Sequence, residues 1–246
     1  MVENIKDNIS EIMRENEGTS SLSKIVPSIT KKGIDNVNLA MFDEQTRNNL
    51  LNAAGDEYVK RGDFVQAVKA FLLTKNVAKI NEVGNIYSSR GLFSQAVEVY
   101  SLAYNFSQDK SKLVNCGEKC ILEGHFSDAL RAFSIVKDEA RLIKLGEICL
   151  DKEKIDVAIE VFAVLNNRER LVKLGDKCLN ENRLGYAARA YEIANDKDKL
   201  SSLGDVLLKS GLLGSALRIY ELANNEMMVK FIRENFSEDQ LGKFYA

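Results

Sequence analysis

A glycine recurs along this chain at a nearly constant interval, and this recurrence restricts the possible folds more than any other feature. Successive copies are 29, 33, 29, 29 and 29 residues apart. The copies are Gly55, Gly84, Gly117, Gly146, Gly175 and Gly204. Self-similarity at such a period is typical of a repeat protein, in which each repeat is one supersecondary unit.

Other positions at a fixed distance from the glycine hold the same kind of residue from repeat to repeat, and we call each such set a column. These columns indicate two helices in each repeat. Leucine or isoleucine lies four residues before it, and tyrosine, cysteine or leucine lies three residues after it. These offsets share one face of a helix. An alanine lies twelve residues after the glycine and an aromatic residue four residues beyond the alanine, which marks one face of a second helix. These two columns are Ala67, Ala96, Ala129, Ala158, Ala187 and Ala216, then Phe71, Tyr100, Phe133, Phe162, Tyr191 and Tyr220.

Turn and cap residues separate the two helices. Seven residues after the repeat glycine stands Gly62, Gly91, Gly124, Glu153, Asn182 or Gly211. Glycine just past a helix end accepts the left-handed conformation that ends many helices. Eight residues before the glycine, from the second repeat onward, stands Asn76, Asp109, Asp138, Asn167 or Asp196. Asparagine and aspartate are favoured N-caps, so each unit is predicted to run cap, first helix, turn and second helix.

The repeat glycine lies in the middle of the predicted first helix, where it costs about 1 kcal/mol relative to alanine. We expect packing to offset this cost. Gly175 is predicted to face Ala187 across the hairpin, so that two small residues let the helix backbones approach closely.

These motifs resemble those of the tetratricopeptide-repeat family. The matching segments include "LNAAGDEY…AVKAF", "INEVGNIY…AVEVY" and "LIKLGEIC…AIEVF". The resemblance implies an all-α fold, a right-handed superhelical solenoid of six helix-turn-helix repeats with N- and C-terminal capping helices. Most units have 29 residues and lack the proline between repeats, whereas the family uses 34, so the second helix should be about a turn shorter. Short units of this kind also resemble the helical-hairpin arms of membrane-coat and ciliary-transport proteins.

The chain is predicted to have three parts. Residues 48–225 hold the repeats. Residues 226–246 form a C-terminal capping helix and tail, with apolar Met228, Val229, Ile232 and Phe236, charged Lys230, Arg233 and Glu234, and a cap at Asn225. Residues 1–47 form a helix with a stripe of Ile5, Ile9, Ile12 and Met13, a linker around "EGTSSLSK", and a second short helix that covers the first hairpin.

Composition excludes several function classes. The net charge of −2 argues against a nucleic-acid partner, which would require a basic surface. The sequence contains no run of about 20 apolar residues, so we expect no membrane insertion. The charged N-terminus is not a secretory signal, and we therefore expect a cytoplasmic protein. Cys116, Cys120, Cys149 and Cys178 form no C-x2-C pair and are predicted to be packing residues. We expect no metal, cofactor or catalytic site.

The resemblance places a ligand in the concave groove lined by the first helices. The acidic column, one residue after the repeat glycine, includes Glu118, Glu147, Asp176 and Asp205. The apolar columns, three residues before and four after it, include Val114, Ile143 and Val172, then Ile121, Leu150, Leu179 and Leu208. We expect this groove to bind a basic, amphipathic protein segment. Alternatively, the apolar columns pack between adjacent first helices and the acids are solvated.

A basic column stands five residues before the glycine. It contains Lys79, Lys112, Arg141, Arg170 and Lys199. Six residues separate it from the acidic column, which is about 120° around the helix. The basic column therefore either forms ion pairs between repeats or presents an edge to an anionic partner.

The prediction is a non-catalytic scaffold that binds a protein or peptide, with its oligomeric state open. One alternative is a structural subunit of a larger assembly, which would use its ends and its N-terminal region. Another is a repeat-based sensor or enzyme accessory domain.

Overall fold

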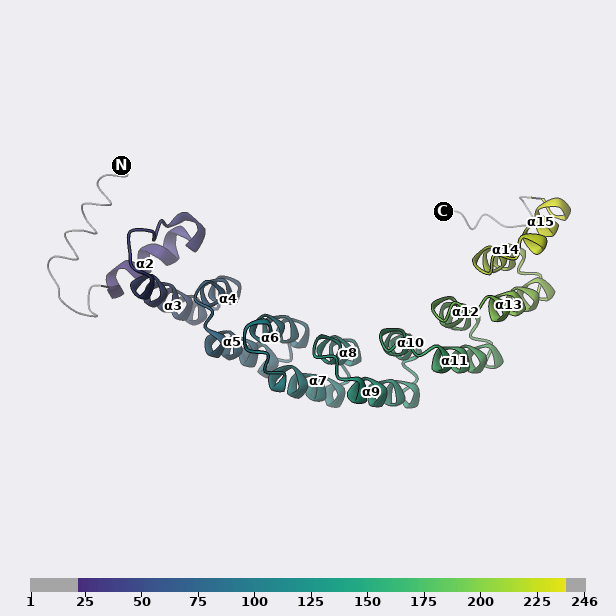
Figure 1. Cartoon of the computed structure of the whole chain (residues 1–246), viewed down its shortest axis with the longest axis horizontal. Coiled ribbons are helices and arrows are strands. Elements are labelled where there is room, and N and C mark those ends of the chain that lie inside the picture. Colours follow the sequence, from purple (N-terminus) through teal and green to yellow (C-terminus); the bar gives the residue numbers. More distant parts are fainter. Residues whose placement is uncertain (1–21, 238–246) are drawn as a thin grey trace. The chain divides into compact units, whose positions relative to one another are not determined.

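The computed structural model describes residues 22–237, and within this range it contains only helices and their connections. The chain divides into two compact units at the boundary between Val136 and Lys137. Figure 1 shows two layers of helices in each unit. In each unit the first helices form one layer: α3 (Glu44–Arg61), α5 (Val77–Ser89) and α7 (Ser111–Glu123) in the first unit, and α9 (Glu139–Asp151), α11 (Arg168–Asn180) and α13 (Lys197–Lys209) in the second.

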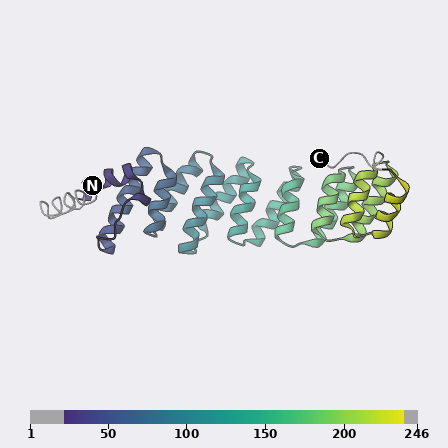
Figure 2. The ribbon, with the colours of Figure 1, turned by 90° about the horizontal axis from the view of Figure 1, so that it is seen from above.

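The second helices form the other layer. They are α4 (Phe64–Leu73), α6 (Phe93–Ser107) and α8 (Phe126–Ile135) in one unit, and α10 (Ile155–Val164), α12 (Leu184–Ile193) and α14 (Leu213–Leu222) in the other. Each first helix packs on the second helix of its own hairpin, and α4, α6, α10 and α12 also pack on the first helix that follows. Figure 2 shows these helices side by side. The predicted helical-hairpin repeat is confirmed.

The repeat glycine makes room for an aromatic ring, and its contact with the alanine of the same repeat stays a prediction. A Cβ on Gly175 would lie 2.4 Å from Cε1 of Tyr191, and the next two nearest atoms also belong to that ring. At each of the other repeat glycines the added Cβ would lie within 2.7 Å of the ring of its own repeat. The alanine column is fully buried. The ring, which reaches further than a methyl group, fills the space between the helices.

The turns confirm the predicted left-handed residues. Gly62, Gly91, Gly124 and Gly211 have positive φ, and so do Glu153 (56°) and Asn182 (57°), which replace glycine in two repeats. A second left-handed column ends the second helices. It comprises Lys75, Gln108, Lys137, Asn166, Asn195 and Asn224.

The predicted N-caps are confirmed with one exception. The side chains of Asn76, Asp138, Asn167 and Asp196 each accept a hydrogen bond from the backbone N–H three residues on. Asp109 does not occupy the N-cap position of α7, because the preceding helix α6 has 15 residues whereas the other second helices have 10. The N-cap of α7 is therefore Lys110, and Asp109 accepts hydrogen bonds from Ser111 instead. The longer α6 accounts for the 33-residue interval.

The segment before the first hairpin is partly described. α2 (Leu22–Lys32) packs on α3, with Ile29 fully buried, and a 3-10 turn η1 (Ile34–Asn36) follows. The Tyr58 hydroxyl donates to the Thr30 carbonyl at 3.4 Å. α2 matches the predicted short helix, although it begins inside the predicted linker and contains Pro27. The helix predicted around Ile5 to Met13 lies outside the described residues.

The predicted C-terminal helix is α15 (Glu226–Asn235), capped by Asn225. Ile232 is fully buried, whereas Met228, Val229 and Phe236 are half-buried. Its packing partner is α14. The exposed side chains include Lys230, Arg233 and Glu234 as predicted.

Candidate functional site

The predicted acidic and basic columns contact each other between neighbouring repeats. Lys79 Nζ lies 3.1 Å from Asp56 Oδ1, in the first and second repeats. In the other unit, the Arg170 guanidinium lies 3.1 Å from Glu147, and Lys199 Nζ lies 2.7 Å from Asp176. An acid of one repeat thus joins a base of the next. These contacts correspond to the inter-repeat ion pairs considered for the basic column.

The other charged residues of the acidic and basic columns also lie on first helices. Arg141 is paired within its own helix cap, with Nη1 2.8 Å from Asp138 Oδ2. Lys112 is half-buried at the start of α7, and Glu118 is exposed on the same helix. Asp205 is exposed on α13, where it accepts a hydrogen bond from a tyrosine of α14.

Tyrosines of the aromatic column hydrogen-bond the residue that follows the repeat glycine. The hydroxyls of Tyr100, Tyr191 and Tyr220 donate to Asn85, Asp176 and Asp205 at 2.8, 2.7 and 2.6 Å. Sequence reasoning missed these bonds. The available signal was that each tyrosine copy is matched with asparagine or aspartate, whose short side chain keeps its oxygen near the hydroxyl.

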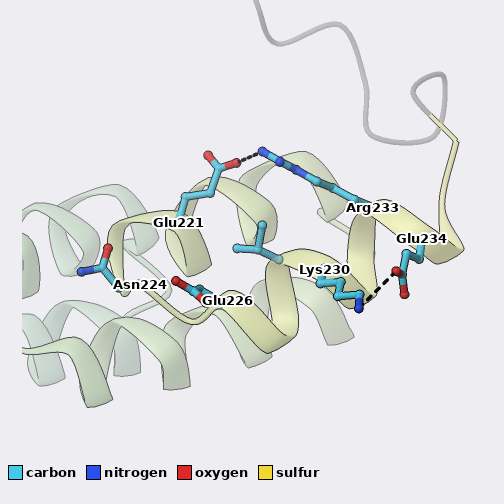
Figure 3. A pocket seen from close by; sticks show the side chains of 7 residues that line it. Glu221, Asn224, Glu226, Lys230, Arg233 and Glu234 are labelled. Carbon is cyan, nitrogen blue, oxygen red and sulfur yellow. Dashed lines mark hydrogen bonds and ion pairs between the residues drawn. The ribbon is translucent and has the colours of Figure 1, made fainter.

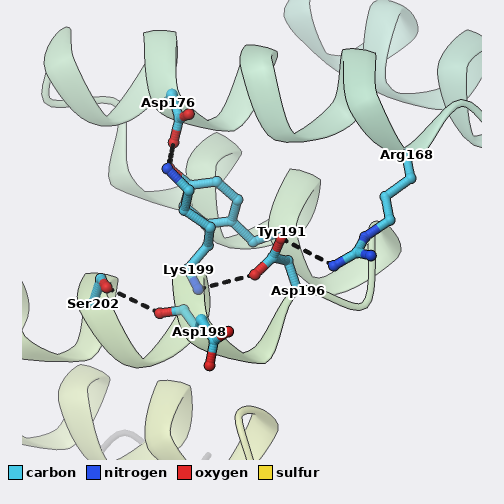
Figure 4. Close-up of polar contacts among 7 residues, drawn as sticks. All are labelled: Arg168, Asp176, Tyr191, Asp196, Asp198, Lys199 and Ser202. Carbon is cyan, nitrogen blue, oxygen red and sulfur yellow. Dashed lines mark hydrogen bonds and ion pairs between the residues drawn. The ribbon is translucent and has the colours of Figure 1, made fainter.

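Asp176 accepts side-chain hydrogen bonds from two neighbouring helices, in the group of polar residues drawn in Figure 4. It accepts from the Tyr191 hydroxyl and from Lys199 Nζ, each at 2.7 Å. Burial raises the pKa of Asp176, but the hydrogen bonds from Lys199 and Tyr191 outweigh it and leave the pKa below its usual value. Burial and the bond to Asp176 raise the pKa of Tyr191. This carboxylate joins three helices, α11, α12 and α13.

The predicted apolar columns are largely covered. Val114 is buried, and Ile143, Val172, Ile121, Leu150, Leu179 and Leu208 are half-buried. Half-burial leaves each side chain limited area for a partner. Binding of a basic segment on the first helices stays a prediction.

A more exposed apolar column lies on the second helices, eighteen residues after the repeat glycine. It comprises Leu73, Leu102, Ile135, Val164, Ile193 and Leu222. We call it the second-helix column. Leu73, Val164, Ile193 and Leu222 are 56, 49, 41 and 36% exposed, and the other two are half-buried. Every copy is aliphatic, which sequence reasoning could have found by extending the columns beyond the aromatic residue.

The cysteines are buried packing residues. Burial raises the pKa of the Cys149 thiol to about 11 and also raises that of Cys178. A hydrogen bond with Cys120 lowers the pKa of Cys116, and the pKa of Cys120 is raised in turn. Across the part of the chain that is described, no three His, Cys, Asp or Glu side chains are grouped to hold a metal ion.

The hollows on the described residues include one in each unit. One, of about 770 Å³, lies between α14 and α15 and is lined by both helices (Figure 3). Arg233 pairs across it with Glu221 at 2.6 Å, and Lys230 lies 3.7 Å from Glu234. The other, of about 390 Å³, lies among the loop after η1, the start of α3 and the end of α4.

Comparison with known proteins adds no family assignment. No model of a protein family matches this sequence, and no curated protein gives a significant match. None of the helices between residues 22 and 237 has the length and apolar character needed to cross a membrane.

Proposed function

We propose that this protein is a non-catalytic scaffold, a tetratricopeptide-like solenoid that binds a protein partner. The glycine–ring contact in all six repeats supports the tetratricopeptide-like assignment. In such a fold, stacked hairpins present one position of the repeat several times along a surface. A partner that uses several copies of that position gains affinity from each.

The second-helix column is the observation that carries this proposal. Val164, Ile193 and Leu222 lie on three successive second helices of one unit and remain 36 to 49% exposed. Their burial by a partner contributes about 25 cal/mol for each Å² of apolar area removed from water. The acids at Glu147 and Asp176 are already paired with bases, so they have less to offer a basic segment.

The test compares two triple variants in a pull-down from the native cell. The first is Val164→Asp, Ile193→Asp and Leu222→Asp, which places charge in the second-helix column. The matched variant is Glu147→Lys, Asp176→Lys and Asp205→Lys, which changes the acidic column. Thermal unfolding of both confirms that each remains folded.

We expect the first triple variant to lose a prey protein that the second retains. Loss of the prey by the acidic-column variant alone would indicate that the binding site lies on the first helices. A scaffold of this kind is contradicted if neither variant loses prey that the intact chain captures.

The C-terminal hollow favours a second candidate, a subunit of a larger assembly. Arg233 stands 29 residues after Gly204, where the earlier repeats have glycine. The hollow beside it is lined by Glu221 of α14 and Val229 of α15, and Phe231 on α15 is 45% exposed. Sedimentation of the intact chain tests this candidate. Association that weakens in a Phe231→Ser variant would favour an assembly subunit.

A further inference from the structure

The hollow of about 390 Å³ at the start of the first unit combines apolar walls with charged groups. Leu51 and Leu39 form buried parts of its wall, and Leu73 of α4 is 56% exposed there. The volume falls within the range of small-ligand pockets, about 300 to 1,000 Å³, and accommodates a large aliphatic side chain with adjoining backbone.

Two cations line this hollow without partners. Neither the Arg47 guanidinium nor the Lys75 ammonium forms an ion pair or side-chain hydrogen bond with any residue in the described range. Nearby lysines differ, because Lys69 pairs with Asp35 and Lys79 with Asp56. Unpaired cations beside an apolar pocket favour a ligand that joins a carboxylate to an apolar group.

The other polar lining groups suit a peptide backbone. Glu44 and Asn48, on the first turns of α3, also line the hollow. A carboxylate and an amide oxygen both accept hydrogen bonds, so these side chains can receive backbone N–H groups of an extended segment. Glu44 is the one acid among the charged lining residues, which leaves the lining net positive.

We propose that this hollow binds a short acidic peptide segment of a partner protein. An aliphatic side chain packs against Leu51 and Leu73, and a neighbouring carboxylate pairs with Arg47 and Lys75. The inference rests on the proposed function in that the ligand belongs to a protein. Its site lies in the other unit from Val164, Ile193 and Leu222, so the two proposals fail separately.

The structure offers a substitution that removes one cation without straining the fold. Lys75 has φ of 52°, in the left-handed region where glycine is at ease. Lys75→Gly therefore deletes the charge and preserves the turn. Lys137 has φ of 51° in the corresponding turn two repeats later, so Lys137→Gly is the matched control.

The probe is a blocked peptide, acetyl-Gly-Leu-Asp-Glu-Gly-amide, titrated into the full chain and followed by backbone amide NMR shifts. We expect saturable shifts at Leu73 and Lys75, weakened by about 0.5 M salt. Lys75→Gly and Arg47→Gln should each weaken binding about fivefold, and Lys137→Gly should leave it unchanged.

Two control peptides decide the outcome. One replaces Asp-Glu with Asn-Gln, and the other replaces leucine with serine. The proposal is overturned if either control binds as tightly as the probe, or if the probe gives no saturable shift at these residues. If the triple variant at Val164, Ile193 and Leu222 still loses its prey in the pull-down, the scaffold function would then stand without this peptide site.

Discussion

The Cα of Gly175 lies so close to the Tyr191 ring that an added Cβ would be 2.4 Å from Cε1. The ring is fully buried between α11 and α12, so it has little room to move away. We expect Gly175→Ala to lower the free energy of unfolding by about 1–3 kcal/mol, although alanine favours a helix by about 1 kcal/mol. Urea denaturation measures this difference.

Gly185, on the partner helix α12, is the matched control for this substitution. A Cβ at Gly185 would meet no atom within 4 Å. Gly185→Ala should therefore stabilise the chain by up to about 1 kcal/mol. Effects of the same sign at both positions would contradict the packing argument.

Asn81 carries a buried side-chain oxygen without a hydrogen-bond partner. Valine stands at the same repeat position at Val114 and Val172. We expect Asn81→Val to raise the free energy of unfolding by about 1 kcal/mol, because it removes an unsatisfied acceptor. Chemical denaturation of the variant beside the parent chain checks this.

Asn52 occupies the equivalent position in the first repeat and provides the contrast. Its Oδ1 accepts from Thr74 at 3.0 Å and from Asn76 at 2.9 Å. Asn52→Val should destabilise by about 1 kcal/mol or more, since it leaves those donors without their acceptor. A stabilising effect here would show that valine is favoured at this position for another reason.

Asp176 should contribute to the acid sensitivity of the fold. Its pKa is lowered in the folded state by Lys199 and Tyr191. A lowered pKa gives stability that is present above the unfolded value, about 3.9, and is lost as pH falls through the folded value. Because the side chain is 40% exposed, we expect at most about 1 kcal/mol, reduced by salt.

The measurement is urea unfolding from pH 6 to pH 2.5 for the parent chain and for Asp176→Asn. Asparagine still accepts from tyrosine, as Asn85 does from Tyr100. The stability difference between the two proteins should shrink as the pH falls. A difference that stays constant would exclude a role for this carboxylate charge.

Cys149 should be inert in the folded protein. Its side chain is fully buried, and burial raises the pKa of its thiol to about 11. Since the thiolate is the reactive form, alkylation near neutral pH should be slow until the chain unfolds. Mass spectrometry after iodoacetamide treatment, with and without denaturant, measures this. Rapid labelling of Cys149 under native conditions would contradict the buried position.

Local signals account for the part of the structure that could be predicted. A cap such as Asn167 and a turn residue such as Asn182 act on backbone groups within a few residues of themselves. Their spacing therefore predicted where helices begin and end, even where Glu153 replaces glycine. Asp109 failed as a cap because the longer α6 changed the turn that precedes α7.

The amino-acid sequence by itself determined the hairpins, their number and their order, because helix periodicity and turn chemistry depend on near neighbours along the chain. Only the tertiary structure decided that Gly175 accommodates the Tyr191 ring, that Lys199 pairs with Asp176, and that four of the six side chains in the second-helix column stay exposed. Those contacts join residues 15 or more positions apart. They depend on how far each side chain reaches across the interface between packed helices. The residue type at one repeat position does not specify the distance between those helices.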